Sequence, residues 1–168
     1  MTHKTYVFST ELVGFQGVRR TITVRDDLTL VDLHYALQSA YGWDDDHLYS
    51  FWLDGAFWAS EEEHYTHPRH AASFDPPGKT ACARLDELAL DVGRRVAYVF
   101  DFAREWRVEL ELLEIRAGGE RAVTRCVERV GAAPPQYEDV MLEPSQEETA
   151  TQRTVEFVAL MVEEADAA

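Results

Sequence analysis

The sequence predicts an α+β fold in a single domain, and three patterns indicate it. Hydrophobic and polar residues alternate on both sides of the turn Gly14-Phe15-Gln16-Gly17, which is typical of a β-hairpin. Hydrophobic residues then recur at helical spacing over residues 30–41. A second alternating stretch, over residues 96–112, predicts another hairpin. We therefore expect both hairpins to lie in one sheet, with the helix packed across it.

The first third of the chain predicts strand, strand, helix and strand in that order. Residues 6–12 and 18–25 keep their apolar side chains on one face of each strand. Thr29 and Asp32 match a capping box at the start of the helix, and Gly42 ends it. An aromatic-rich strand follows over residues 47–53. This β-β-α-β order is similar to the opening of a β-grasp or roll fold.

The remainder of the chain is less regular. Charge runs and turn-forming residues over 54–84 predict a long surface excursion, followed by a short helical turn near residues 85–90. After the second hairpin, a turn at Gly118-Gly119 leads to a further strand within 122–130. Pro134 and Pro135 predict an irregular segment, because neither can donate a hydrogen bond to a strand. A closing helix is expected over about 146–164.

Composition narrows the classes of function. The 168 residues, 46% of them hydrophobic, can bury one core, so one domain is expected over 1–168. A net charge of −15 repels phosphate backbones, so direct binding of duplex nucleic acid is not expected. No signal-peptide core or membrane-spanning run is present, which predicts a cytoplasmic protein without membrane contact. Cys82 and Cys126 are expected to be unpaired small core residues.

Several motifs occur together in a fixed order. They are Tyr41-Gly42-Trp43-Asp44, His47-Leu48-Tyr49-Ser50-Phe51, Tyr98-Val99-Phe100-Asp101-Phe102 with Trp106, and Pro134-Pro135 with Glu138-Asp139-Val140. In this order the chain resembles the plasmid pRi open-reading-frame-three-like family over about residues 5–142. The resemblance implies an α+β fold, an origin on bacterial or archaeal mobile or chromosomal loci, and labels such as transposon passenger or resolvase-type protein. It implies no established activity.

The chain departs from this family pattern at three places. Ala103-Arg104 stands where the family usually has Gly-Asp, and Val108 stands where histidine is common. Gln136-Tyr137 separates the two prolines from Glu138-Asp139. A site that depends on the usual polar groups at these positions is therefore in question for this chain.

The motifs suggest one cluster of candidate functional residues. His47 and Asp101 could do acid–base or metal chemistry if the strands bring them together, with the Asp44-Asp45-Asp46 run nearby. The alternative, which we favour, is that they satisfy backbone groups while the aspartates flank a turn. No residue is assigned as catalytic and no cofactor is expected. The whole cluster comprises His34, Trp43, His47, Asp101, Trp106 and Tyr137.

Two further patterns were weighed. His64, His67 and His70 could, with Cys82, offer zinc ligands, but the spacing is not that of a zinc finger and Pro68 interrupts a helix. A mobile, metal-free loop is therefore expected there. Six aromatic residues between positions 43 and 58 could form a platform on which nucleic-acid bases stack, although burial in the core is favoured. They are Trp43, Tyr49, Phe51, Trp52, Phe57 and Trp58.

Three hypotheses of function follow. The first is a non-enzymatic interaction module that recognises a protein partner through an aromatic and acidic groove. The second is an accessory protein of mobile DNA elements, recruited by another protein. The third is a small metal-dependent or acid–base enzyme that uses His47 and Asp101. The sequence leaves the oligomeric state open.

Overall fold

A computed structural model describes residues 2–118 and 123–137 of the chain. The chain divides into two units, Met1–Gln136 and Tyr137–Ala168, of which the first is compact. The closing helix expected over 146–164, and the Glu138-Asp139-Val140 motif, lie outside the described residues. No helix in the described part is both long enough and apolar enough to cross a membrane.

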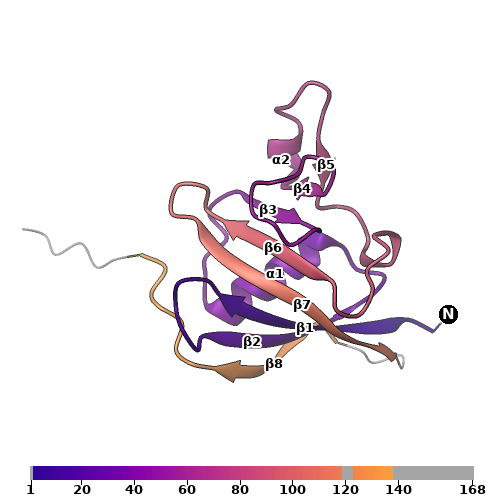
Figure 1. Cartoon of the computed structure of the whole chain (residues 1–168), viewed down its shortest axis with the longest axis vertical. Coiled ribbons are helices and arrows are strands. Elements are labelled where there is room, and N and C mark those ends of the chain that lie inside the picture. The colour runs from indigo at the N-terminus through magenta and orange to yellow at the C-terminus, as the bar shows by residue number, and fades with distance from the viewer. Residues whose placement is uncertain (1, 119–122, 138–168) are drawn as a thin grey trace, which may run out of the picture. The chain divides into compact units, whose positions relative to one another are not determined.

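The first unit is built on an eight-stranded sheet in the order β5-β4-β3-β6-β7-β1-β2-β8 (Figure 1). Neighbouring strands are antiparallel, except that β4 and β5 are parallel. The strands are β1 (Lys4–Leu12), β2 (Arg19–Arg25), β3 (Tyr49–Trp52), β4 (His64–Thr66), β5 (Lys79–Thr80), β6 (Arg95–Phe100), β7 (Trp106–Ala117) and β8 (Arg125–Val130). The helical elements are α1 (Leu30–Tyr41), α2 (Pro68–Ala71) and the 3-10 turn η1 (Leu85–Glu87).

The predicted α+β class is correct, and the first four elements have the expected order. Thr29 and Asp32 form the predicted capping box, and Gly42 ends α1 in the left-handed conformation with φ of 72°. The β-grasp arrangement is not confirmed, because β6 and β7 lie between β1 and β3. The second hairpin, β6–β7, inserts into the centre of the sheet. The two motif segments that contain β3 and β6, His47–Phe51 and Tyr98–Phe102, therefore lie near the middle of the sheet.

Residues 54–84 are more ordered than the sequence predicts. They contribute β4 and β5 to one edge of the sheet and the short helix α2. Pro68 begins α2 instead of breaking it, because the first helical residue needs no backbone N–H. His67 caps this helix, since its Nδ1 accepts a hydrogen bond from the N–H of Arg69 at 3.0 Å. The expected irregular loop is thus wrong for the His64–His70 segment.

The strand expected within 122–130 is present as β8, but it does not extend the second hairpin. It pairs with β2 at the far edge of the sheet, and both β1 and β2 lie between it and β7. Cys126, half-buried in this strand, and Cys82 are both unpaired, as expected. Cys82 is exposed, so its predicted place in the core is wrong.

The main core lies between α1 and one face of the sheet, here called the inner face. Figure 1 shows α1 running behind the strands. Phe8 and Ile22 of the first hairpin, and Leu37 of α1, are completely buried there. Tyr98 and Val108 contribute the second hairpin to the same core. Burial of this apolar surface is the main favourable term that holds the helix on the sheet.

Arg20 is the unusual member of this core, because it is only 5% exposed and carries a charge. Its Nε donates to the carbonyl of Ala40 at 2.9 Å, in the last turn of α1. One of its terminal nitrogens donates to the carbonyls of Arg19, Val130 and Gly131. Arg20 thus joins α1, β2 and the end of β8. The partial negative charge at the C-terminus of the helix favours a cation here.

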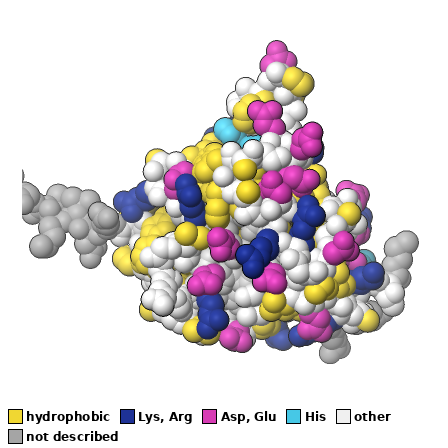
Figure 2. All heavy atoms as spheres, in the orientation of Figure 1, with side chains coloured by type: hydrophobic (Ala, Val, Ile, Leu, Met, Phe, Trp, Pro, Cys, Tyr) yellow, Lys and Arg dark blue, Asp and Glu magenta, His cyan; other side chains and the backbone are white. Residues whose placement is uncertain are grey.

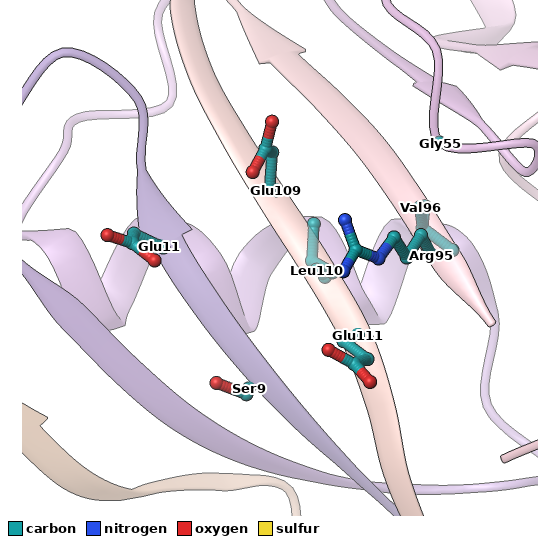
Figure 3. A pocket seen from close by; sticks show the side chains of 8 residues that line it. All are labelled: Ser9, Glu11, Gly55, Arg95, Val96, Glu109, Leu110 and Glu111. Carbon is teal, nitrogen blue, oxygen red and sulfur yellow. The ribbon is translucent and has the colours of Figure 1, made fainter. Parts of the chain in front are cut away.

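The opposite face of the sheet, here called the outer face, is not covered by α1. Figure 2, in the orientation of Figure 1, shows this face with acidic and basic side chains interspersed over its middle and hydrophobic side chains gathered higher up. A cavity of about 160 Å³ opens on it (Figure 3). The cavity is lined by Ser9, Glu11, Gly55, Arg95, Val96, Glu109, Leu110 and Glu111.

Candidate functional site

The segments His47–Phe51 and Tyr98–Phe102 are neighbours in the sheet. Tyr49 of β3 pairs with Phe100 of β6, and α1 packs over both. Trp43, which follows α1, covers this junction. Its ring stacks on Tyr41 at 4.9 Å and on Phe100 at 5.6 Å, and it lies 5.6 Å from the ring of Trp106. The candidate residues therefore converge around Phe100.

His34 projects from α1 into this junction and is 1% exposed. Its ring lies on Tyr49 with 3.6 Å between centroids. Its Nδ1 is 2.7 Å from the hydroxyl of Tyr98, and its Nε2 is 2.8 Å from a carboxylate oxygen of Asp45. Gln38 donates to the same Tyr98 oxygen at 3.0 Å. These bonds form a chain that runs from the core to the half-exposed Asp45.

The hydrogen bonds define which nitrogen of His34 carries the proton. A carboxylate only accepts, so Nε2 carries hydrogen and donates to Asp45. Nδ1 then accepts from the Tyr98 hydroxyl, whose oxygen in turn accepts from Gln38. Burial lowers the pKa of His34 to about 4, against the opposing effect of Asp45. His34 is therefore neutral at pH 7.

The arrangement of Asp45, His34 and Tyr98 has the order of an acid–base relay, but its burial argues against catalysis. Tyr98 is completely buried, and burial raises the pKa of its hydroxyl well above the ordinary value. A nucleophile or general acid must reach a substrate atom to within hydrogen-bond distance. The Tyr98 oxygen is instead occupied by His34 and Gln38. The relay is best explained as a structural network between α1 and β6.

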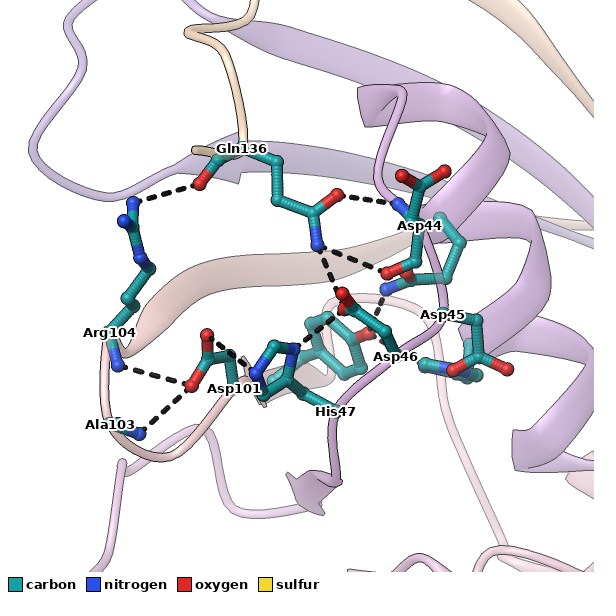
Figure 4. A network of polar contacts seen from close by, with 11 residues as sticks. Asp44, Asp45, Asp46, His47, Asp101, Ala103, Arg104 and Gln136 are labelled. Carbon is teal, nitrogen blue, oxygen red and sulfur yellow. Dashed lines mark hydrogen bonds and ion pairs between the residues drawn. The ribbon is translucent and has the colours of Figure 1, made fainter. Parts of the chain in front are cut away.

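His47 and Asp101 are brought together at the surface end of the same junction (Figure 4). The Nε2 of His47 is 3.6 Å from a carboxylate oxygen of Asp101, and its Nδ1 is 2.6 Å from Asp46. The ring of His47 meets Phe100 edge-on at 6.0 Å. His47 is 40% exposed, whereas the Asp101 side chain is 5% exposed. Of this pair, His47 is therefore the member that solvent reaches.

The geometry of Asp101 indicates a structural task. Its backbone has a positive φ of 60°, and one carboxylate oxygen accepts from the N–H groups of Ala103 and Arg104 at 3.1 and 3.2 Å. The N–H of Glu105, which also has a positive φ, bonds the Asp101 carbonyl. Asp101 thus organises the turn between β6 and β7. Because the donors at 103 and 104 are backbone groups, the change from Gly-Asp to Ala103-Arg104 preserves this turn.

Gln136 closes the network from the other side, as Figure 4 shows. Its side-chain oxygen accepts from the N–H of Asp44 at 2.6 Å, and its nitrogen donates to the carbonyl of Asp44 and to a carboxylate oxygen of Asp46, both at 3.1 Å. Arg104 donates to the Gln136 carbonyl at 2.9 Å. The first unit therefore ends anchored on the Asp44–Asp46 run. Tyr137, the remaining predicted residue, is 42% exposed and belongs to the second unit.

Sequence reasoning did not identify Tyr98, Gln38, Gln136 or Arg104 as members of this network. Tyr98 alternates with Val96 and Phe100 as an ordinary core position, so no local signal marked its hydroxyl. Gln38 occupies the buried side of α1, and a polar residue at an otherwise apolar position is a signal of a buried hydrogen bond.

Two buried nitrogens, Nε1 of Trp43 and Nε1 of Trp106, have no hydrogen-bond partner within the described residues.

The three candidate histidines of the 64–70 segment do not form a metal centre among themselves. His64 bonds Ser50 at 2.8 Å, His67 caps α2, and the rings of His64 and His70 lie 6.5 Å apart. Across the described residues, one group of possible metal ligands has its ligand atoms within 4.8 Å of one another. It consists of His3, Asp26 and Asp27. Arg25 already binds both carboxylate oxygens of Asp27, which leaves that group a poor cation site.

Two of these histidines, His64 and His70, instead belong to an aromatic surface on the outer face, which we call the aromatic platform. It comprises Trp52, Phe57, Trp58, His64, His70, Phe74 and Phe102. Trp52 lies at its base, with Trp58 at 4.8 Å and His64 stacked at 4.9 Å. Phe102 is 5.5 Å from Trp58 and 5.0 Å from His70, which is 5.0 Å from Phe74. Trp58 and Phe74 are 46% and 44% exposed.

The expectation that these aromatic residues are buried in the core is wrong for some members of the platform. Trp43, Tyr49 and Phe51 are core residues of the inner face, as favoured. Trp52 is also buried, but in a second small cluster on the outer face with Ala97 and Val99. Phe57 and Phe102 pack partly buried against that cluster. Successive side chains of a strand point to opposite faces, so this alternation along β3 predicts that Trp52 lies on the opposite face from Phe51.

Comparison with known proteins gives a family and a fold. A family model described as plasmid pRiA4b ORF-3-like protein matches residues 4–153. No curated protein matches the chain. A crystal structure described as a protein of unknown function, MM3350 from Methanosarcina mazei Go1, is similar with a TM-score of 0.66. The two are 24% identical over 81% of this chain and 74% of the other, a likeness that shows the fold alone.

Proposed function

This chain belongs to the plasmid pRiA4b ORF-3-like protein family, and we propose its function from the side chains on its surface. In this proposal the protein is a non-enzymatic module that binds a protein partner on the aromatic platform. The expected groove beside the motif segments is replaced in this proposal by the outer face. The motif residues His34, Trp43 and Asp101 are each 5% exposed or less, so they are poorly placed to touch a partner.

The observation that carries the proposal is the conformation of Trp58. Its backbone has a positive φ of 61°, which is costly for a bulky residue, by roughly 1–3 kcal/mol. This strain holds nearly half of a large indole in solvent, on top of Trp52 and beside Phe102. The Ala59 N–H bonds the carbonyl of Ala56, so Trp58 is the third residue of a β-turn, where glycine or asparagine adopts a positive φ at lower cost than tryptophan. Exposed tryptophan at the centre of an aromatic patch is typical of an interaction hot spot.

The chemistry of the chain also defines the occupant. With 31 acidic and 16 basic residues, the protein attracts basic partners and repels copies of itself. Several cations near the platform are already engaged. Arg94 is paired with Glu63, Arg107 with Glu105, and Lys79 donates to the carbonyl of Glu62. We therefore assign the platform to a basic segment of a protein partner that presents an apolar side chain to Trp58 and Phe74.

The proposal is tested with the purified full chain and a displayed library of short random peptides. We expect the selected peptides to combine apolar and basic residues, and Trp58→Ala to weaken their binding about tenfold or more. Tyr35→Ala is the matched control, because Tyr35 is 53% exposed on α1, away from the outer face. It should leave binding unchanged.

Three outcomes would overturn the proposal. The first is failure to select any peptide, and the second is equal binding by the parent and Trp58→Ala proteins. The third is self-association that Trp58→Ala abolishes, measured by light scattering, because it would assign the platform to a second copy. Thermal melts of both variants should stay close to that of the parent, which separates lost binding from lost folding.

A further inference from the structure

The outer face carries an electrostatic feature next to the aromatic platform. In the register of β1 and β7, Glu11 stands directly opposite Glu109. Both side chains are exposed, and within residues 2–118 and 123–137 no cation lies within ion-pair distance of either one. Like charges opposed across an antiparallel pair destabilise a sheet. The sheet therefore retains an arrangement that does not favour its own folding.

The two carboxylates also share a space. Glu11 and Glu109 line the cavity of about 160 Å³, and both also border a second cavity of about 390 Å³ at the tip of the first hairpin. A cavity of roughly 150 Å³ can hold a benzene molecule, so the first cavity can take a planar guanidinium. Figure 3 shows Glu109 at the top, Glu11 at the left, and Glu111 and Ser9 lower down, with the Arg95 side chain between Glu109 and Glu111.

Two basic residues flank this pair but leave it unneutralised. Arg95 lines the same cavity and stands opposite Glu111 in the register of β6 and β7. Arg19 stands opposite Glu11 on the other side, in β2. Neither arginine comes within ion-pair distance of a carboxylate in the described part of the chain. Glu11 and Glu109 are therefore two carboxylates that the register sets directly opposite each other without a cation of the described residues between them.

A row of paired residues across the sheet links the cavity to the aromatic platform. One row of cross-strand partners runs Trp52, Ala97, Glu109, Glu11. Adjacent strands are about 4.8 Å apart, so Glu109 lies roughly 10 Å from Trp52. The loop that carries Phe57 and Trp58 passes close to the cavity at Gly55. Only glycine fits at this position, because a Cβ atom on residue 55 would lie 2.9 Å from the Cβ of Arg95.

On the basis of the proposed function, we infer that the cavity between Glu11 and Glu109 receives an arginine or lysine side chain of the partner segment that binds the aromatic platform. The inserted cation removes the repulsion between the two carboxylates and fixes the direction of the bound segment. An extended chain advances about 3.3 Å per residue, so the basic residue stands about three positions from the apolar one.

The test uses a fluorescein-labelled peptide, Gly-Ser-Trp-Ser-Gly-Arg-Ser-Gly, and its counterpart with glutamine in place of arginine. Fluorescence anisotropy gives the dissociation constants for the full-length protein. We expect the arginine peptide to bind at least about fivefold more tightly. The double variant Glu11→Gln and Glu109→Gln should bind both peptides equally. Glu87→Gln, which removes one exposed charge elsewhere, should keep the preference.

The results separate the two proposals. Binding that requires Trp58 but does not distinguish arginine from glutamine, with the glutamate variants unchanged, overturns the cation-binding cavity and leaves the platform. Binding that does not require Trp58 overturns the platform and the inference with it. Loss of the arginine preference in Glu87→Gln as well would show a long-range effect of net charge and would overturn the cavity. The glutamine variants should melt no lower than the parent, since they remove a repulsion.

Discussion

The imidazole of His34 lies flat on the phenol ring of Tyr49, with 3.6 Å between centroids and 11° between the planes. This contact joins the helix to β3 at the point where the two sequence motifs meet. The same imidazole bonds Tyr98 in β6 and Asp45 after the helix. His34 thus connects four segments while remaining neutral and buried.

His34 should make the stability of the protein depend on pH. Burial lowers its pKa in the folded state to about 4, whereas the unfolded chain keeps a value near 6.5. Between these values the unfolded state binds more protons, so stability falls as pH falls from about 6.5 to about 4. The loss is up to roughly 3 kcal/mol. Above pH 6.5 the contribution is constant, because His34 is neutral in both states.

Urea denaturation at a series of pH values measures this dependence, and His34→Gln provides the control. His64 and His70 also have a lowered pKa through burial, so the parent retains some pH dependence from them in either case. The difference between parent and variant isolates His34. Identical slopes for the two proteins between pH 5 and 6.5 would contradict the expectation.

Asp101 should be replaceable by asparagine but not by alanine. Asparagine tolerates a positive φ and keeps an oxygen that can accept from Ala103 and Arg104. Alanine loses both bonds, and we expect Asp101→Ala to lower the free energy of unfolding by about 1–3 kcal/mol. Urea denaturation of both variants is the measurement. If Asp101→Ala is as stable as the parent, our conclusion that the Asp101 side chain organises this turn is wrong.

Trp43 should contribute more to stability than Trp106. Trp43 is 5% exposed and contacts three aromatic rings, whereas Trp106 is only partly buried and packs on the exposed Phe15. We expect Trp43→Ala to cost about 3–5 kcal/mol, and Trp106→Ala clearly less. Because the Trp43 N–H has no partner in the described structure, Trp43→Phe should recover most of the loss. Equal losses in Trp43→Ala and Trp106→Ala, from thermal and urea denaturation, would refute this order.

Local patterns were sufficient for much of the fold. The capping box at Thr29, the Gly42 stop and the alternation along β6 and β7 are short-range signals, and each element that they predict is present. The position of β8 could not be predicted in this way. Its partner is β2, about a hundred residues earlier, and pairing over that distance depends on the whole sheet. The prediction that Pro68 interrupts a helix is wrong because the cost of proline depends on its exact position, and the first helical residue needs no N–H.

The site was predicted only in part, for a physical reason. Aromatic and histidine residues mark places where something unusual is buried, so the approach of His34, Trp43, His47 and Asp101 to Phe100 could be expected. The platform depends on which face of β3 each ring takes, and on residues 54–84 folding back over that face. Glu11 and Glu109 face each other only because β7 lies beside β1. No spacing within the sequence encodes that adjacency.

The last prediction concerns Arg20, the buried cation that joins α1 to β2 and β8. Its guanidinium donates to four carbonyls from two separate nitrogens, an arrangement that the single ammonium of lysine cannot reproduce. Arg20→Lys should therefore lose several of these hydrogen bonds and lower the free energy of unfolding by about 2–4 kcal/mol. Arg19→Lys is the matched control, since the neighbouring side chain is exposed on the other face, and it should change stability by less than about 0.5 kcal/mol. Urea denaturation compares the two substitutions, which have the same chemistry and differ only in burial. Equal effects would mean that Arg20 holds α1 through its charge alone, and that the geometry of its hydrogen bonds does not matter.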